Sequence, residues 1–184
     1  MTGTYNQGVI LGGLVDLWDL TRNDNATNTS THASYLSMAV DLASSAMGNL
    51  KDDNGVLHEA RNVGWMDESQ RNFKGVFVQH LAYLASRILA NKAEAFSTPI
   101  NVPDCMAPAA VDRPTFMSQF KEFLVRNYQA VISLPGNKDT LSTCSSSSGL
   151  VWQASPEAQI SAGYMSTQSV LNLFIAYDAY VTAV

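Results

Sequence analysis

Five stretches of the chain carry apolar residues at helical spacing, and they differ in how much of the helix surface is apolar. Over about 6–20, 69–89 and 166–184, apolar residues occupy nearly every side of the predicted helix. Over about 33–50 and from 112 past Val131, they recur every three or four positions, with polar residues on the opposite side. A helix that is apolar on every side is buried on every side. The pattern therefore predicts three inner helices alternating with two outer ones.

Capping and turn signals mark the ends of these helices. Thr31 is the expected cap of the second helix, and Asp112 followed by Pro114 is the expected start of the fourth. The sequence Asp-Asp-Asn-Gly at 52–55 is typical of a turn. Two short extended segments are expected in the loops, at 56–59 and 149–152.

The first helix contains Gly8, Gly12 and Gly13. A glycine costs a helix about 1 kcal/mol, so three in a helix that persists predict close packing against neighbouring helices. Alternating inner and outer helices are the arrangement of an α/α toroid. The expected fold is thus all-α, a partial (α/α)6 toroid forming a single domain over 1–184. Because the row of inner helices is incomplete, one edge of it should expose apolar surface.

Composition narrows the class of protein. The 184 residues suit one domain with a real core, and 46% hydrophobic against 15% charged residues excludes disorder. Lys and Arg number 11 against 16 Asp and Glu, a net charge of −5, and no basic stripe for nucleic acid is visible. No apolar run reaches the roughly 18 residues that cross a bilayer. A weakly charged, acidic surface is compatible with a neutral ligand such as a polysaccharide.

Other signals concern processing and the thiols. Asn25 and Asn28 each begin an Asn-X-Ser/Thr triplet, and two in one loop favour a secretory origin. Residues 1–4 lack the basic region and cleavage site of a signal peptide. Cys105 and Cys144 lie in loop-like sequence, where they either form a disulfide or remain free thiols.

No pattern for metal binding or nucleophilic catalysis is evident. His32, His58 and His80 have no Cys or His partner at the spacing of metal ligands. A glycine-rich phosphate loop and a Ser-His-Asp signature are also missing. We therefore expect neither a metal nor a cofactor.

Five stretches stand in an informative order: TYNQGVILGGL at 4–14, NGVLHE at 54–59, FKGVFV at 73–78, GLVW at 149–152 and TQS at 167–169. In this order and approximate spacing, they resemble glycoside hydrolase family 76, the α-1,6-mannanase family. The resemblance covers nearly the whole chain. It implies the C-terminal half of a toroidal catalytic domain, secreted or located in the cell wall, that cleaves α-1,6-mannosidic bonds in mannan such as that of fungal cell walls.

The same resemblance makes one absence important. Members of this family resemble retaining glycosidases with two adjacent aspartates upstream of the Tyr-Asn-Gln-Gly stretch, and such chemistry needs two carboxyl groups about 5–5.5 Å apart. Only residues 1–4 precede Tyr5, so this segment is not present and no catalytic residue is assigned. Asp52 and Asp53 form an adjacent pair on the other side of Tyr5, where Asn54-Gly55 indicates a solvated turn. The chain is therefore expected to be inactive without a missing N-terminal half.

Candidate sugar contacts lie mainly at the starts of the inner helices, which line one mouth of such a toroid. Aromatic rings stack on the apolar face of a pyranose, and amides bond its hydroxyls. The substrate-binding candidates are Tyr5, Asn6, Gln7, His58, Phe73, Lys74, Trp152, Tyr164 and Gln168. Plainer roles stay open: helix capping for Asn6 and Gln7, core packing for Phe73 and Trp152, and a surface turn for His58.

Two other functions stay open beside that of a hydrolase fragment. One is a non-catalytic module that binds mannan or another carbohydrate. The other is a structural helical module whose open apolar edge takes a partner, with the glycine-rich first helix as the interface.

Overall fold

A computed structural model describes residues 3–22, 29–58, 73–90, 112–134 and 164–183, and the structural statements below refer to these residues. They form five α-helices: α1 (Thr4–Thr21), α2 (Thr29–Asn49), α3 (Phe73–Ala90), α4 (Arg113–Ser133) and α6 (Tyr164–Ala183). The described residues contain no strand, and Lys51 and Leu57 form one isolated antiparallel bridge. The predicted all-α class is confirmed.

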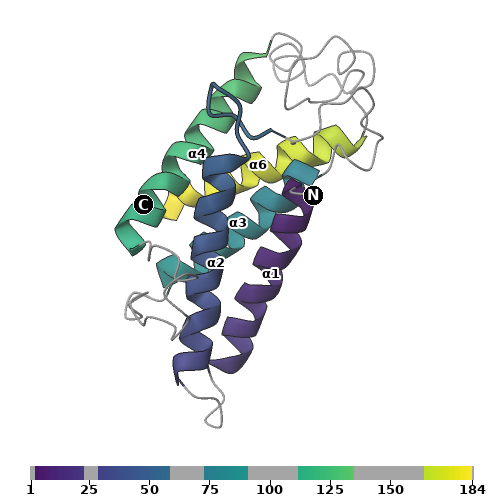
Figure 1. Ribbon diagram of the computed structural model, residues 1–184. Helices are drawn as coiled ribbons and strands as arrows, with labels where there is room; N and C mark the ends of the chain where they lie inside the picture. The colour runs from purple at the N-terminus through teal and green to yellow at the C-terminus, as the bar shows by residue number, and fades with distance from the viewer. Residues whose placement is uncertain (1–2, 23–28, 59–72, 91–111, 135–163, 184) are drawn as a thin grey trace.

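The helices lie in two layers, with α2 and α4 in front of α3 and α6 in Figure 1. One row consists of α1, α3 and α6, because α3 packs against both of the others. The second layer consists of α2, which packs on α1, and α4, which packs on α6 and on α2. The two layers group the helices as the sequence pattern does, and below we call them the inner row (α1, α3 and α6) and the outer layer (α2 and α4). Closure of the inner row into a toroid stays a prediction.

The core lies between the two layers, and α3 is at its centre because it contacts each of the other four described helices. Phe77 of α3 meets Phe123 of α4 edge to face, with ring centroids 6.2 Å apart. Burying one such side chain stabilises the fold by about 1.5–3 kcal/mol. The largest fully buried side chains are Trp18, Phe77, Phe116, Phe120, Leu11, Leu57, Leu81, Leu84, Ile88, Leu124, Leu173 and Val15.

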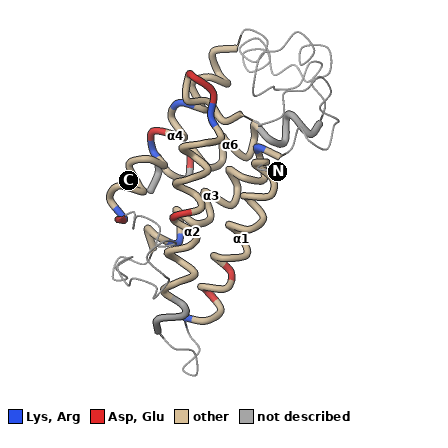
Figure 2. The backbone as a smooth tube through the Cα atoms, in the orientation of Figure 1, with Lys and Arg blue, Asp and Glu red and all other residues tan. Residues whose placement is uncertain are grey.

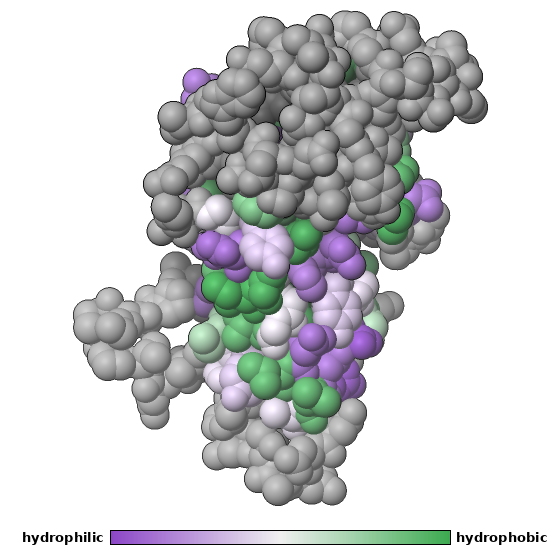
Figure 3. Space-filling model, turned by 90° about the vertical axis from the view of Figure 1, so that its right-hand side faces the viewer, coloured by the Kyte–Doolittle hydropathy of each residue, from purple (hydrophilic) through white to green (hydrophobic). Residues whose placement is uncertain are grey.

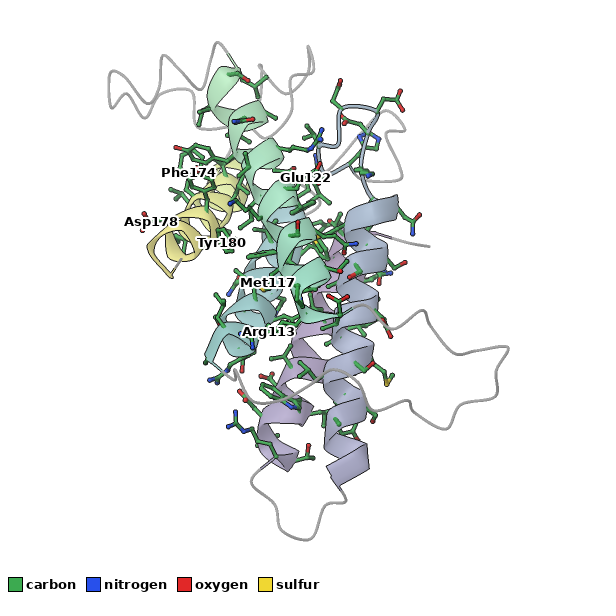
Figure 4. The ribbon with its side chains drawn as sticks, turned by 90° about the vertical axis from the view of Figure 1, so that its left-hand side faces the viewer. Arg113, Met117, Glu122, Phe174, Asp178 and Tyr180 are labelled. Carbon is green, nitrogen blue, oxygen red and sulfur yellow. The ribbon has the colours of Figure 1, made fainter. Side chains whose placement is uncertain are left out.

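Aromatic contacts join α4 to α6 (Figure 4). Phe120 and Tyr180 meet edge to face at 5.5 Å between centroids. Tyr128 stacks on Tyr177 at 4.1 Å and also contacts Phe174 at 5.2 Å. Such ring pairs contribute about 0.5–1.5 kcal/mol beyond the area they bury, which explains how the amphipathic α4 is attached to the inner row.

Two of the three glycines of α1 lie against α3. A Cβ on Gly8 would lie 2.8 Å from the Cα and 2.9 Å from the backbone nitrogen of Phe77, and one on Gly12 would overlap the His80 ring. Gly13 has no atom within 4 Å of such a position. Close packing is therefore confirmed at Gly8 and Gly12, whereas Gly13 faces outward.

The helix ends agree with the sequence in one case and differ in another. The Asp112 carboxylate accepts a hydrogen bond of 2.8 Å from the Thr115 amide, and Pro114 occupies the first turn of α4, as predicted. The predicted cap Thr31 is wrong, because α2 begins at Thr29 and Thr31 lies in its first turn. Thr29, Ser30 and Thr31 are all residue types that cap helices, so the sequence pattern gave no means of choosing among them.

The predicted turn after α2 is confirmed. Asp52 accepts hydrogen bonds of 2.9 Å from the Asn54 and Val56 amides through Oδ1, and Gly55 has a φ of 78°, a conformation that favours glycine. Asp53 is exposed. The adjacent aspartates thus form a turn at the surface, as expected from Asn54-Gly55.

A fully buried asparagine connects this turn to the second layer. Asn127 of α4 accepts a hydrogen bond of 2.8 Å from the Leu57 amide and donates one of 2.8 Å to the Phe123 carbonyl. Each side of the amide therefore has a backbone partner in the core. Asn127 fixes the segment after α2 on α4.

The predicted apolar edge is present on α1. Four apolar side chains of this helix are exposed by 43–73%: Val9, Ile10, Leu17 and Leu20. Figure 3 shows hydrophobic surface interspersed with polar surface on one side of the molecule. At the other end of the inner row, α6 exposes 43% of Leu171 and 65% of Ile175. The two helices at the ends of the inner row, α1 and α6, thus both present apolar side chains to solvent.

Candidate functional site

The first turns of α1 and α3 lie side by side and bring two of the candidate residues into contact. The rings of Tyr5 and Phe73 are 5.0 Å apart between centroids and inclined by 40°. Tyr5 is 43% exposed and Phe73 is half-buried. An open aromatic pair of this kind offers an apolar surface with a hydroxyl at its edge, which suits one face of a sugar ring.

This geometry follows from the way the two helices run. Tyr5 contacts Phe73, Gly8 lies against Phe77, and Asp19 binds Arg87, so each later contact on α1 pairs with a later residue on α3. The two helices are therefore parallel, and their N-terminal ends meet. In Figure 1 the first turn of α6 lies on the same side of the molecule as the N-terminus.

Three further candidates lie on these first turns. Asn6 is exposed and Gln7 is half-buried, so their amides are accessible to different degrees. The α1 cap position belongs to Gly3, which makes no side-chain cap bond. Lys74 retains only 7% of its surface, which leaves it far less accessible to a ligand than Tyr5.

His58 is positioned by a different element. Its amide donates a hydrogen bond of 2.9 Å to the Leu50 carbonyl, next to the Leu57 amide that Asn127 holds. The side chain is half-buried. The structure thus places His58 at the end of the turn that follows α2 and fixes the backbone at its amide and at the preceding residue.

The remaining predictions fall outside what the structure describes. Tyr164 and Gln168 belong to the first two turns of α6, where the backbone is described and these side chains are not. Five other predicted residues lie outside the described ranges altogether: Trp152, the cysteines Cys105 and Cys144, and the glycosylation candidates Asn25 and Asn28.

A second cluster, at the other end of the α1–α3 pair, was missed by the sequence reasoning. The Tyr83 hydroxyl lies 3.2 Å from Asp16 Oδ1 and 3.1 Å from Asp19 Oδ2. Arg87 binds Asp19 at 2.6 Å, and its guanidinium lies 5.2 Å from the centre of the Tyr83 ring. His80 is near Asp16, on the same side of α3. The spacing of three and four residues among these polar positions was the available signal.

The protonation states of this cluster follow from its contacts. The hydrogen bond from Arg87 lowers the pKa of Tyr83, but burial and Asp19 outweigh it and raise that pKa overall, so the hydroxyl stays protonated and donates. Burial lowers the pKa of His80, and the Asp16 carboxylate offsets only part of this effect. His80 is therefore neutral at pH 7.

The cluster is better suited to holding two helices together than to chemistry. Asp19 is engaged by Arg87 and Tyr83 at once, so it is not an available acid or base. The Arg87–Asp19 pair is 41% and 20% exposed, and partly exposed pairs of this kind contribute at most about 1 kcal/mol. The cluster fixes the register of α1 on α3.

Two wider features bear on the kind of site. Within the described ranges, no group of three or more His, Cys, Asp or Glu side chains could hold a metal ion. None of the helices, as far as they are described, is both long and apolar enough to cross a membrane.

Comparisons with known proteins add nothing to this geometry. No family model matches the chain, and neither the curated proteins nor the solved structures contain a match. The class that the fold defines is an all-α protein of two helical layers, and the candidate site rests on the described residues themselves.

Proposed function

We propose that this chain is part of a glycoside hydrolase family 76-like toroid that acts on α-1,6-mannan, and that it contributes sugar contacts rather than the catalytic carboxylates. The observation that supports this most is the partly exposed Tyr5–Phe73 pair on the first turns of α1 and α3, with the exposed Asn6 on the same turn of α1. An aromatic surface next to an amide provides both kinds of contact that a pyranose needs.

The surrounding structure is compatible with a neutral polysaccharide. The first turns of both α1 and α3 have no acidic residue, and Lys74, the lysine on the first turn of α3, is buried. Among the described residues, a neutral sugar therefore meets little fixed charge on these two first turns. The acidic groups of α1 lie toward its other end, at Asp16 and Asp19.

Titration calorimetry with α-1,6-linked mannooligosaccharides tests the binding. We expect Tyr5→Ala to weaken it about tenfold, because a ring contact of about 1.4 kcal/mol corresponds to that factor. The matched control is Leu20→Ala, which also truncates an exposed side chain of α1 but lies about 22 Å further along the helix, and it should leave binding unchanged. No heat of binding at millimolar oligosaccharide contradicts the proposal.

A reducing-sugar assay tests the catalytic part separately. The chain alone should release no sugar from α-1,6-mannan above the background of buffer. Hydrolysis by the chain above that background would show that the assignment of a binding role is wrong. Asp52→Asn and Asp53→Asn would then show whether this aspartate pair or other carboxylates are responsible.

A further inference from the structure

The backbones of α1 and α3 meet one turn from the Tyr5–Phe73 pair. Gly8 follows Tyr5 by three residues and Phe77 follows Phe73 by four, spacings at which residues share one side of a helix. A Cβ on Gly8 would lie 2.8 Å from the Phe77 Cα. The rings of Tyr5 and Phe73 are 5.0 Å apart between centroids. The separation of the two rings therefore depends on how closely the backbones approach at Gly8.

The rest of α1 is held on α3 further along the helix. The acidic residues of α1 lie in its second half (Figure 2), where Asp19 binds Arg87 at 2.6 Å. This ion pair lies about 16 Å from Gly8 and about 21 Å from Tyr5 along the helix axis. A displacement of α1 that leaves the ion pair in place therefore grows toward the N-terminal end of the helix, and it is larger at Tyr5 than at Gly8.

We propose that Gly8 is a positioning residue of the sugar site. By letting the backbones of α1 and α3 touch, it holds the Tyr5 ring against Phe73, so that one pyranose contacts both rings. Gly8 is buried, so it acts through Tyr5 and does not meet the sugar itself. This inference rests on the proposed function, because it concerns the same aromatic pair.

The size of the effect follows from the distances. In Gly8→Ala, the new methyl group reaches ordinary contact, about 3.4 Å in place of 2.8 Å, when α1 moves by about 0.6 Å at this residue. With the ion pair fixed, Tyr5 then moves by about 0.8 Å. A gap of about 0.5–1 Å removes a quarter to a half of a van der Waals contact. A sugar that rests on Phe73 loses that share of its contact with Tyr5, so binding should weaken about two- to threefold, against about tenfold when the ring is removed.

Nuclear Overhauser effects between the ring protons of Tyr5 and Phe73 measure the position of the pair without sugar. In the full chain, Gly8→Ala should weaken them by roughly a factor of two, because the effect falls steeply with distance and the rings move about 0.8 Å further apart from 5.0 Å. Gly12→Ala is the matched control. It crowds the same pair of helices, but it meets the His80 side chain, which can rotate aside, so the ring contact should stay unchanged.

A second variant separates this effect from a loss of stability. Gly8→Ala is also prepared together with Gly13→Ala, which meets no atom within 4 Å and favours the helix. Circular dichroism shows that this double variant is folded, and it should have the same weakened ring contact as Gly8→Ala alone. An unchanged ring contact in the folded double variant overturns the proposal.

Titration calorimetry with α-1,6-linked mannooligosaccharides tests the consequence for binding. Gly8→Ala should weaken binding about two- to threefold, whereas Gly12→Ala should leave it unchanged. In a Tyr5→Ala background, Gly8→Ala should have no further effect, because the ring through which it acts is gone. An equal loss in both backgrounds, or unchanged binding when the ring contact is weakened, overturns the proposal. Absence of binding by the unchanged chain contradicts the proposed function instead, and the ring contact still decides whether Gly8 positions the pair.

Discussion

The contact between Gly8 and α3 provides the sharpest test of the fold. Replacing Gly8 by alanine places a methyl group 2.8 Å from the Phe77 Cα, 2.9 Å from its nitrogen and 3.2 Å from the Val76 carbonyl carbon. These are backbone atoms, which cannot move aside by rotating a side chain. The Gly8→Ala change therefore forces α1 and α3 apart at the centre of the inner row.

Two opposing effects set the magnitude of the change. Alanine favours a helix over glycine by about 1 kcal/mol, whereas overpacking a core costs about 1–3 kcal/mol. The clash involves backbone atoms of a helix pair in the core, which cannot move aside. We therefore use the upper half of the overpacking cost, about 2–3 kcal/mol. We expect Gly8→Ala to lose about 1–2 kcal/mol of unfolding free energy.

Gly13→Ala is the matched control, since it makes the same chemical change in the same helix where no neighbour lies within 4 Å. It should gain about 0.5–1 kcal/mol, so the two variants should differ by about 1.5–3 kcal/mol. For a chain of this length that difference corresponds to roughly 3–12 °C in Tm. Thermal unfolding followed by circular dichroism at low micromolar chain measures it. Equal stabilisation of both variants would refute the parallel packing of α1 on α3.

Two further predictions concern single buried or half-buried groups. Asn127→Ala removes the partner of the buried Leu57 amide and should lower the free energy of unfolding, measured with denaturant, by about 1–3 kcal/mol. The control is Asn49→Ala, which loses a similar bond to Ser45 at an exposed position and should change that free energy by under about 0.5 kcal/mol. Comparable losses in the two variants would contradict the role given to Asn127. Because burial lowers the pKa of His80 below the ordinary 6.5, its contribution to stability is present above pH 6.5 and is lost as the pH falls through the folded-state pKa. His80→Gln should therefore lose less stability than the unchanged chain between pH 7.5 and 5, and parallel stability curves would contradict this reasoning.

Much of the fold could be predicted from the sequence because burial leaves a periodic trace. α3 is apolar on nearly every side, and it contacts all the other described helices. α4 has a capping aspartate and an early proline, and it begins where they indicate. The start of α2 could not be fixed, since several neighbouring residues cap helices equally well. The choice between Gly8 and Gly13 as packing sites depends on which side of α1 faces α3, and composition does not reveal that.

The candidate site was predictable to a smaller extent. Tyr5 and Phe73 were each chosen for their place at a helix start, yet their contact follows only from the parallel direction of α1 and α3. The Asp16–Tyr83–Arg87 cluster was overlooked because the apolar residues of α1 dominate its pattern and hide two acidic positions on one flank. Contacts between side chains distant in sequence depend on how far one helix is shifted along its neighbour, and the pattern of a single sequence does not predict that shift.

The two ends of the α1–α3 pair have different physical roles. Toward the C-terminal ends, Tyr83 and Arg87 engage the acidic groups of α1, and about one turn from the N-terminal ends Gly8 allows the backbones to touch. At the N-terminal ends only the Tyr5–Phe73 contact joins ring to ring, and it is partly open to solvent. Under the proposed function, a sugar at that end would meet side chains whose backbone is already fixed, so little backbone entropy would be lost on binding. The contacts that fix this backbone lie further along the two helices, away from the proposed site.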